Sequence, residues 1–200
     1  MRILVIRHGE SEADLLDVHE GRADFELTER GRRQAAAMAC HVKENYDVSA
    51  IYCSTLMRAR QTAGYLSEAM GIPLIPDERL MEFNNGLIAG LERAVAREKY
   101  PPVKDLPLHA SVYEQESILE FRFRADYMLS KIISETDSDA TVAVITHGGM
   151  VNQLYRAFLR LPIDSDIVFA TGDTGIHEWR ISQGRRVVVK SNMTEHAKDI

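Results

Sequence analysis

Ile3-Leu4-Val5-Ile6-Arg7-His8-Gly9-Glu10 is the stretch that decides the fold. Its four-residue apolar run predicts a strand that is buried on both faces, as in a parallel sheet between helices. The run ends at a cation, an imidazole and a glycine, which lets the backbone turn sharply after the strand. Because open α/β sheets bind ligands outside the carboxyl ends of their strands, we expect His8 to lie at a ligand site.

The same arrangement recurs late in the chain. Val142-Ala143-Val144-Ile145 is a second apolar run, and Thr146-His147-Gly148-Gly149 follows it. If both strands run to one edge of the sheet, His8 and His147 meet there. The free N–H groups of a helix that begins after this strand suit an anion, so we place the Gly148 amide in an expected phosphate site.

Helical and strand-like patterns alternate along the rest of the chain. They predict helices at 29–45, capped by Thr28, from a Ser54 or Thr55 cap to Gly71, near 91–99, at about 117–136 and at about 150–160. They also predict strands at 48–53 and 73–75 and a hairpin of 175–181 with 186–191. The predicted fold is α/β, a three-layer sandwich with a mostly parallel central sheet, an antiparallel edge strand and helices on both faces. We expect one domain over 1–200, in which the irregular residues 83–117 form a lid over the site.

Composition narrows the class of protein. The net charge of −6 argues against a nucleic-acid partner, and no apolar stretch approaches the ~20 residues of a membrane span. With a strand beginning by residue 3, we expect no signal peptide and a cytoplasmic location. Cys40 and Cys53 are expected to be buried thiols rather than a disulfide, and no closely spaced His/Cys/carboxylate set indicates a metal site. The oligomeric state stays open, a homodimer included.

Two arginines and a glutamate complete the expected site. Arg58 falls in the first turn of the helix after strand 48–53, where a cation opposes the helix dipole unless an anion binds beside it. Arg7 and Arg58 could hold phosphoryl oxygens bidentately, and their charges would keep His8 neutral and nucleophilic. Glu82 has apolar neighbours, which favour a protonated carboxyl that can donate to a leaving alkoxide.

Each of these residues also has an ordinary structural interpretation. A single histidine at a strand end is usually structural, Glu82 alone resembles an exposed loop carboxylate, and Arg58 could pair with Glu68 or Glu82. The paired His-Gly strand ends and the two arginines favour catalysis. The remaining histidines are expected at the surface (His19, His41, His109 and His196) or in a structural role in the late hairpin (His177).

Five segments carry a pattern that extends over most of the chain. They are Arg7-His8-Gly9-Glu10 with Ser11; Gly21, Asp24, Leu27, Thr28, Gly31, Gln34 and Ala35; Ser54, Leu56, Arg58, Ala59, Gln61, Thr62 and Ala63; Leu80, Glu82, Gly86 and Gly90; and His147-Gly148-Gly149. In this order they resemble the histidine phosphatase superfamily, the phosphoglycerate mutase-like group. The resemblance implies that His8 becomes phosphorylated, that Arg7, Arg58 and His147 bind the phosphoryl group, and that Glu82 is first acid and then base. It also implies that no metal and no cofactor is needed.

Three positions depart from the family pattern. Asp14 stands where relatives often have an asparagine that helps to hold the phosphate. A carboxylate there would repel a phosphate dianion unless it is turned away, paired or protonated, so we do not assign it that role. Ile88-Ala89 replaces a frequent aromatic-acidic pair, and Thr146 replaces a common serine.

The resemblance implies a phosphoric monoester hydrolase, a metal-independent phosphatase that hydrolyses small phosphomonoesters through a phosphohistidine. The stretch between Glu82 and His147 is shorter than in cofactor-dependent mutases, whose insertions enclose a bisphosphate, and this favours water as the acceptor. A cofactor-dependent phosphoglycerate mutase and a catalytically inactive relative that binds a phospho-ligand stay open as alternatives. The expected partner is a small phosphorylated metabolite, whose identity residues 84–117 would decide.

Overall fold

The computed structural model describes all residues, 1–200. Its single sheet has the strand order β3-β2-β4-β1-β5-β6. The bounds are Arg2–Arg7 for β1, Val48–Cys53 for β2, Leu74–Pro76 for β3, Thr141–Thr146 for β4, Ile176–Ser182 for β5 and Arg185–Met193 for β6. Strands β1 to β4 are parallel, whereas β5 is antiparallel to β1 and to β6. The predicted fold class is confirmed, and the β5–β6 hairpin supplies the antiparallel side of the sheet.

The pairing of β1 with β4 is what positions the site. The two strands are parallel and in register from Arg2↔Thr141 to Arg7↔Thr146. The residues that follow, His8 and His147, therefore leave the sheet side by side. The His8 amide donates to the Thr146 carbonyl at 2.9 Å, so the pairing extends to the first residue of the loop.

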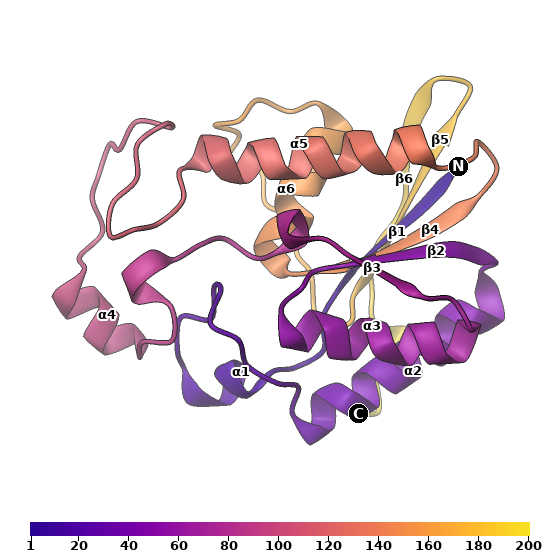
Figure 1. Cartoon of the computed structure of the whole chain (residues 1–200), viewed down its shortest axis with the longest axis horizontal. Coiled ribbons are helices and arrows are strands. Elements are labelled where there is room, and N and C mark those ends of the chain that lie inside the picture. Colours follow the sequence, from indigo (N-terminus) through magenta and orange to yellow (C-terminus); the bar gives the residue numbers. More distant parts are fainter.

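Helices cover both faces of the sheet (Figure 1). The helices α5 (Ile118–Glu135) and α6 (Gly148–Leu159) lie on one face, and α2 (Glu29–Asn45) and α3 (Met57–Met70) on the other. The short helices α1 (Glu12–Leu16) and α4 (Arg93–Lys99) lie beyond the end of the sheet, on the side away from the N-terminus. That side is where β1 and β4 end.

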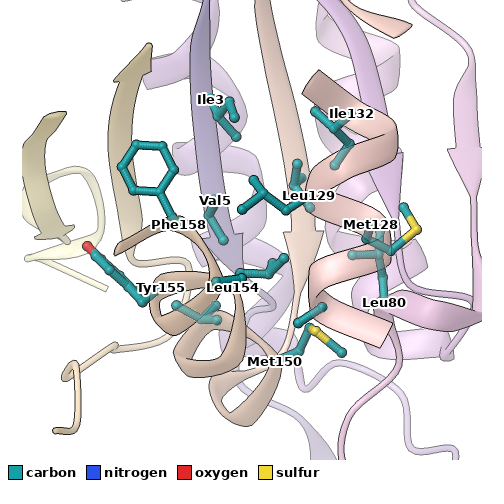
Figure 2. Close-up of a cluster of buried hydrophobic side chains, with 14 of the residues drawn as sticks. Ile3, Val5, Leu80, Met128, Leu129, Ile132, Met150, Leu154, Tyr155 and Phe158 are labelled. Carbon is teal, nitrogen blue, oxygen red and sulfur yellow. The ribbon is translucent and has the colours of Figure 1, made fainter. Parts of the chain in front are cut away.

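Alternating residues of β1 enter two separate cores. Ile3 and Val5 join the cluster with α5 and α6, and Figure 2 shows Val5 near the side chains of Leu129 and Leu154. Leu4 and Ile6 join the cluster with α2 and α3 instead. All four side chains are at most 1% exposed, so the unbroken apolar run is explained by burial on both faces.

Two predicted helix ends are confirmed and one is wrong. The Thr28 hydroxyl accepts from the Gly31 amide at 2.9 Å, and α3 ends at Gly71 with φ of 70°. The expected Ser54 or Thr55 cap of α3 is wrong: the helix begins at Met57 behind Leu56 and has no side-chain cap. Ser54 lies two residues too early, where its hydroxyl contacts the Leu56 amide and the His147 ring.

Both cysteines are free thiols, as expected, but only Cys53 is buried. Cys40 is exposed, so its expected burial is wrong. The inward stripe of α2 is taken by Ala35, Met38, Ala39 and Val42, and Cys40 faces solvent beside it. None of the helices is long and apolar enough to cross a membrane.

Candidate active site

The His8 and His147 rings lie together at the carboxyl ends of β1 and β4. Their centroids are 5.1 Å apart. Both side chains are almost completely removed from solvent, with exposures of 1% for His8 and 0% for His147. The strand register brings these two residues together across more than a hundred positions of sequence.

Hydrogen bonding fixes the His8 tautomer. Its Nδ1 lies 2.7 Å from the Gly9 carbonyl oxygen, which can only accept, so Nδ1 carries the proton. Nε2 is then unprotonated, and it accepts a hydrogen bond from Nε of Arg58 at 3.3 Å. Burial, reinforced by the positive charges of Arg58 and Arg7, holds the pKa of His8 well below its usual value. His8 is therefore neutral at pH 7, with Nε2 available as a nucleophile.

Arg58 is fully buried beside His8 and is held by the loop that follows α1. Its Nη2 donates to the Gly21 carbonyl at 2.8 Å and its Nη1 to the Ala23 carbonyl at 3.0 Å. Its Nε lies 3.0 Å from a Glu20 carboxylate oxygen. The ion-pair partner is thus Glu20, and neither Glu68 nor Glu82 forms a salt bridge with Arg58.

Glu20 is a site residue that sequence reasoning missed. Besides Arg58, its carboxylate accepts from the Ser11 hydroxyl and lies 3.7 Å from Nε2 of His8. Burial raises the pKa of Glu20, although the charge of Arg58 opposes the shift. The one indication in the sequence was its place directly before Gly21, the first residue of the second family segment.

Arg7 lies at the end of β1 and is paired with carboxylates. Its Nη2 lies 3.2 Å from Asp173 and 3.9 Å from Asp14, and its Nη1 donates to the Thr171 carbonyl at 3.1 Å. Asp14 also accepts from the Ser11 amide at 2.9 Å, in a capping box at the start of α1. An Asp14 carboxylate that is turned away, paired or protonated could coexist with a phosphate, and in the structure it is paired with Arg7. Asp173 was not expected at the site.

His147 keeps one ring nitrogen free. Its Nε2 lies 2.7 Å from the Ser54 hydroxyl, whereas its Nδ1 is buried without a hydrogen-bond partner. Burial and the charge of Arg58 hold the pKa of His147 well below its usual value. A buried and unpaired ring nitrogen is the kind of group that a ligand satisfies.

Glu82 reaches the first turn of α6 from the other side of the site. It follows the 3₁₀ turn η1 (Glu78–Leu80), and its two carboxylate oxygens accept from the amides of Phe83 and Gly149, each at 2.8 Å. A Cβ atom on Gly149 would lie 2.3 Å from Glu82 Oε1, so this approach requires a glycine. The Glu82 side chain is half-buried rather than exposed in a loop. Two backbone amides orient its carboxylate, and its apolar sequence neighbours did not predict these amides.

Gly148 is the first residue of α6, which begins without a side-chain cap. The N-terminal end of this helix therefore offers donors and a positive dipole end beside the two histidines.

His177 lies apart from this group. It is buried and bonded to the hydroxyls of Tyr155 at 2.8 Å and Thr171 at 3.0 Å, as suits its expected structural role. No group of three or more His, Cys, Asp or Glu side chains could hold a metal ion.

The family model of the histidine phosphatase superfamily (branch 1) matches residues 3–194. The chain belongs to this superfamily. It is 27% identical over 202 residues to phosphoserine phosphatase 1 of Hydrogenobacter thermophilus, covering 98% of this chain and 94% of that one. It is 30% identical to a 2,3-bisphosphoglycerate-dependent phosphoglycerate mutase of Cytophaga hutchinsonii, covering 88% and 87%. Among solved structures, mycobacterial glucosyl-3-phosphoglycerate phosphatase in complex with VO3 superimposes with a TM-score of 0.83 at 26% identity, covering 96% and 98% of the two chains.

Proposed function

We propose that this histidine phosphatase hydrolyses small phosphomonoesters through a phosphohistidine at His8. The observation that carries the proposal is a neutral, buried His8 whose unprotonated Nε2 lies 3.3 Å from the Arg58 guanidinium and whose ring centroid lies 5.1 Å from that of His147. An unprotonated ring nitrogen beside fixed positive charge is what nucleophilic attack on a phosphoryl group requires, once Arg58 turns its N–H group from Nε2 to the ester.

In the first step, Nε2 of His8 attacks phosphorus and the bond from phosphorus to the ester oxygen breaks. Arg7, Arg58, the Nδ1 side of His147 and the Gly148 amide would hold the equatorial oxygens. Glu82, in its protonated form, would give its proton to the leaving oxygen. Because the phosphoryl group enters a preorganised set of donors, charge that develops in the transition state meets groups that need not reorganise.

In the second step, water attacks the phosphohistidine. Glu82, now a carboxylate, would take the proton from this water, so the N–P bond breaks as inorganic phosphate forms. His8 and the protonated Glu82 are then restored for the next turnover. The Nδ1–H of His8 stays bonded to the Gly9 carbonyl throughout, which delocalises positive charge while the phosphoryl group is attached. The positive charge comes from arginines and amides, and no metal or cofactor enters the scheme.

Hydrolysis is the outcome that the chain favours over transfer to a second phosphoglycerate. An alignment over 98% of its residues covers 94% of a phosphoserine phosphatase. The segment between Glu82 and His147 is short compared with that expected of a cofactor-dependent mutase. A mutase would need an enclosing insertion to retain a bisphosphate while it reorients. The inactive alternative rests mainly on Asp14, whose carboxylate lies 3.9 Å from Nη2 of Arg7 and accepts a hydrogen bond from the Ser11 amide.

Residues 83–117 would form the lid over this site and select the substrate. Residues 19–21 connect the two: Glu20 contacts the site, while the backbone of His19 bonds to Gly90 and Leu91 of the lid. Beyond His19 lies a cavity of about 390 Å³ with mainly apolar walls, which include Ile88, Ala96, Leu106, Val112 and Tyr113, and with Arg93 and Arg97 among its polar residues. The leaving group of a metabolite with an apolar part would fit there.

The proposed partner is therefore a small phosphorylated metabolite rather than a nucleic acid or a membrane, in keeping with the net charge of −6. A cytoplasmic location is proposed with it, and two free thiols support a reducing compartment. A homodimer stays a prediction without a structural argument.

The decisive experiment is a turnover assay with p-nitrophenyl phosphate in EDTA, comparing the wild type with His8→Ala. We expect turnover only in the wild type, and an acid-labile phosphoryl label on His8 after rapid quenching. His109→Ala, at an exposed position in the lid, is the matched control for loss of an imidazole. Retained activity in His8→Ala would contradict the proposal, and primer-dependent interconversion of 2- and 3-phosphoglycerate would indicate the mutase instead.

A further inference from the structure

Glu20 lies beside Nε2 of His8, where the proposed function places the phosphoryl group. One carboxylate oxygen lies 3.0 Å from Nε of Arg58, and the other lies 3.7 Å from Nε2 of His8. An electrophile poised for attack lies roughly 3–3.5 Å from its nucleophile. The Ser11 hydroxyl donates to the same carboxylate. Glu20 thus uses the donors that a substrate oxygen would use, at nearly the distance that phosphorus would have.

Charged groups of both signs already surround this point, and the carboxylates among them already pair with the two arginines. Arg58 faces Glu20 from α3, His8 and Arg7 face it from the end of β1, and Asp14 faces it from α1. Arg7 is also paired with Asp173. A phosphate dianion that entered beside an ionised Glu20 would place two further negative charges next to carboxylates in a site from which water is largely excluded.

We propose that the Glu20 carboxylate acts as an internal anion of the phosphoryl site. While the site is empty, one of its oxygens stands where a phosphoryl oxygen would bind. A phosphoryl group then binds only when Glu20 and the phosphoryl group share one proton. With substrate bound, the protonated carboxyl donates a hydrogen bond to a phosphoryl oxygen, and the donors on Arg58 and Ser11 turn to the ester. Proton transfer in either direction gives the same complex, since a monoanionic ester with ionised Glu20 has the same composition as a dianionic ester with neutral Glu20. The inference rests on the proposed function.

The consequence is a phosphatase that works best in acid. Burial raises the pKa of Glu20 above its ordinary value, and the like charge of Asp14 acts in the same direction. The second pKa of a phosphate monoester is about 6. At a pH above both of these pKa values, neither Glu20 nor the ester carries the proton that the complex needs. The value of kcat/KM should therefore fall about tenfold for each pH unit.

Glu20→Gln separates the charge of this side chain from its shape. The amide keeps the length of the carboxyl and can donate to a phosphoryl oxygen without a proton from solvent. We expect the variant to hydrolyse p-nitrophenyl phosphate at pH 7.5 at least tenfold faster than the wild type in kcat/KM, with a flatter profile between pH 5 and 8. Glu26→Gln, at an exposed carboxylate six residues along the chain, is the matched control and should keep the wild-type profile.

Binding of inorganic phosphate tests the same inference without turnover. Calorimetry at about pH 8.5, where free inorganic phosphate is almost entirely the dianion, in buffers of different ionisation enthalpy should show uptake of about one proton by the wild type and of almost none by Glu20→Gln. Weaker phosphate binding by the folded variant, with an unchanged pH profile and unchanged proton uptake, would overturn the inference and leave Glu20 as an anchor of Arg58. Proton-linked phosphate binding in a wild type that shows no turnover and no label on His8 would retain this inference and remove the proposed function.

Discussion

Gly149 and Glu82 meet at the first turn of α6, where a backbone amide holds a carboxylate. The Gly149 N–H donates to Glu82 Oε2 at 2.8 Å, and a Cβ atom on Gly149 would lie 2.3 Å from Oε1. The glycine therefore sets how closely the proposed acid can approach the phosphoryl site. A role for the second glycine of the His-Gly-Gly segment follows directly from this packing.

Gly149→Ala should consequently impair catalysis more than stability. The new methyl group would push the Glu82 carboxyl away from α6, and a misplacement of about 1 Å typically costs on the order of 10²-fold in rate. Steady-state kinetics with phenyl phosphate would check this. Gly64→Ala is the matched control, because no atom lies within 4 Å of its added Cβ. That variant should keep its activity and gain about 0.5–1 kcal/mol in the free energy of unfolding, as alanine replaces glycine inside a helix.

Glu82→Gln should discriminate between leaving groups. An amide cannot supply the proton that a departing alkoxide needs, whereas p-nitrophenolate leaves without one. We expect kcat for an alkyl phosphate to fall by about 10²–10⁴-fold and kcat for p-nitrophenyl phosphate to fall much less. Equal losses on both substrates would argue against the acid role and leave Glu82 as a residue that only orients the start of α6.

The free energy of unfolding should fall in acid because buried histidines are held neutral in the folded state. His177 allows this effect to be measured on a histidine that lies outside the candidate active site. Burial lowers its pKa to about 4, against about 6.5 in the unfolded chain. Between these values the unfolded state binds more protons, so stability is present above pH 6.5 and is lost as the pH falls toward 4. From pH 7.5 to pH 5 this one group should remove about 2 kcal/mol.

Urea unfolding of the wild type and of His177→Gln would measure that contribution. The variant loses contacts with Tyr155 and Thr171, so it should be less stable than the wild type at pH 8, where neither state binds the proton. The difference between the two proteins should then shrink by about 2 kcal/mol at pH 5. A constant difference across the pH range would mean that His177 titrates alike in both states.

The sequence predicted what local pattern and strand register determine. The apolar run Ile3-Leu4-Val5-Ile6 required burial on both faces, and both cores are present. The two His-Gly strand ends needed only parallel pairing of their strands to meet. By contrast, Glu20 reaches Arg58 through a loop without periodicity, and its partner could not be identified before the loop was placed. Ser54 was predicted as a helix cap from its residue type. Its hydroxyl instead contacts the ring of His147, which follows β4 and is distant in sequence.

The cavity beside His19 gives the last prediction, because the proposed function places the leaving group there. Val112 is one of its wall residues, and Val112→Phe would fill part of the space of about 390 Å³. We expect KM for 1-naphthyl phosphate to rise about tenfold, since pocket contacts of this size discriminate by such factors, while KM for methyl phosphate stays nearly constant. Val187→Phe, on the exposed face of the edge strand β6, is the matched control. Equal effects on both substrates, or none on either, would mean that the leaving group binds outside this cavity and that the lid selects substrates in another way.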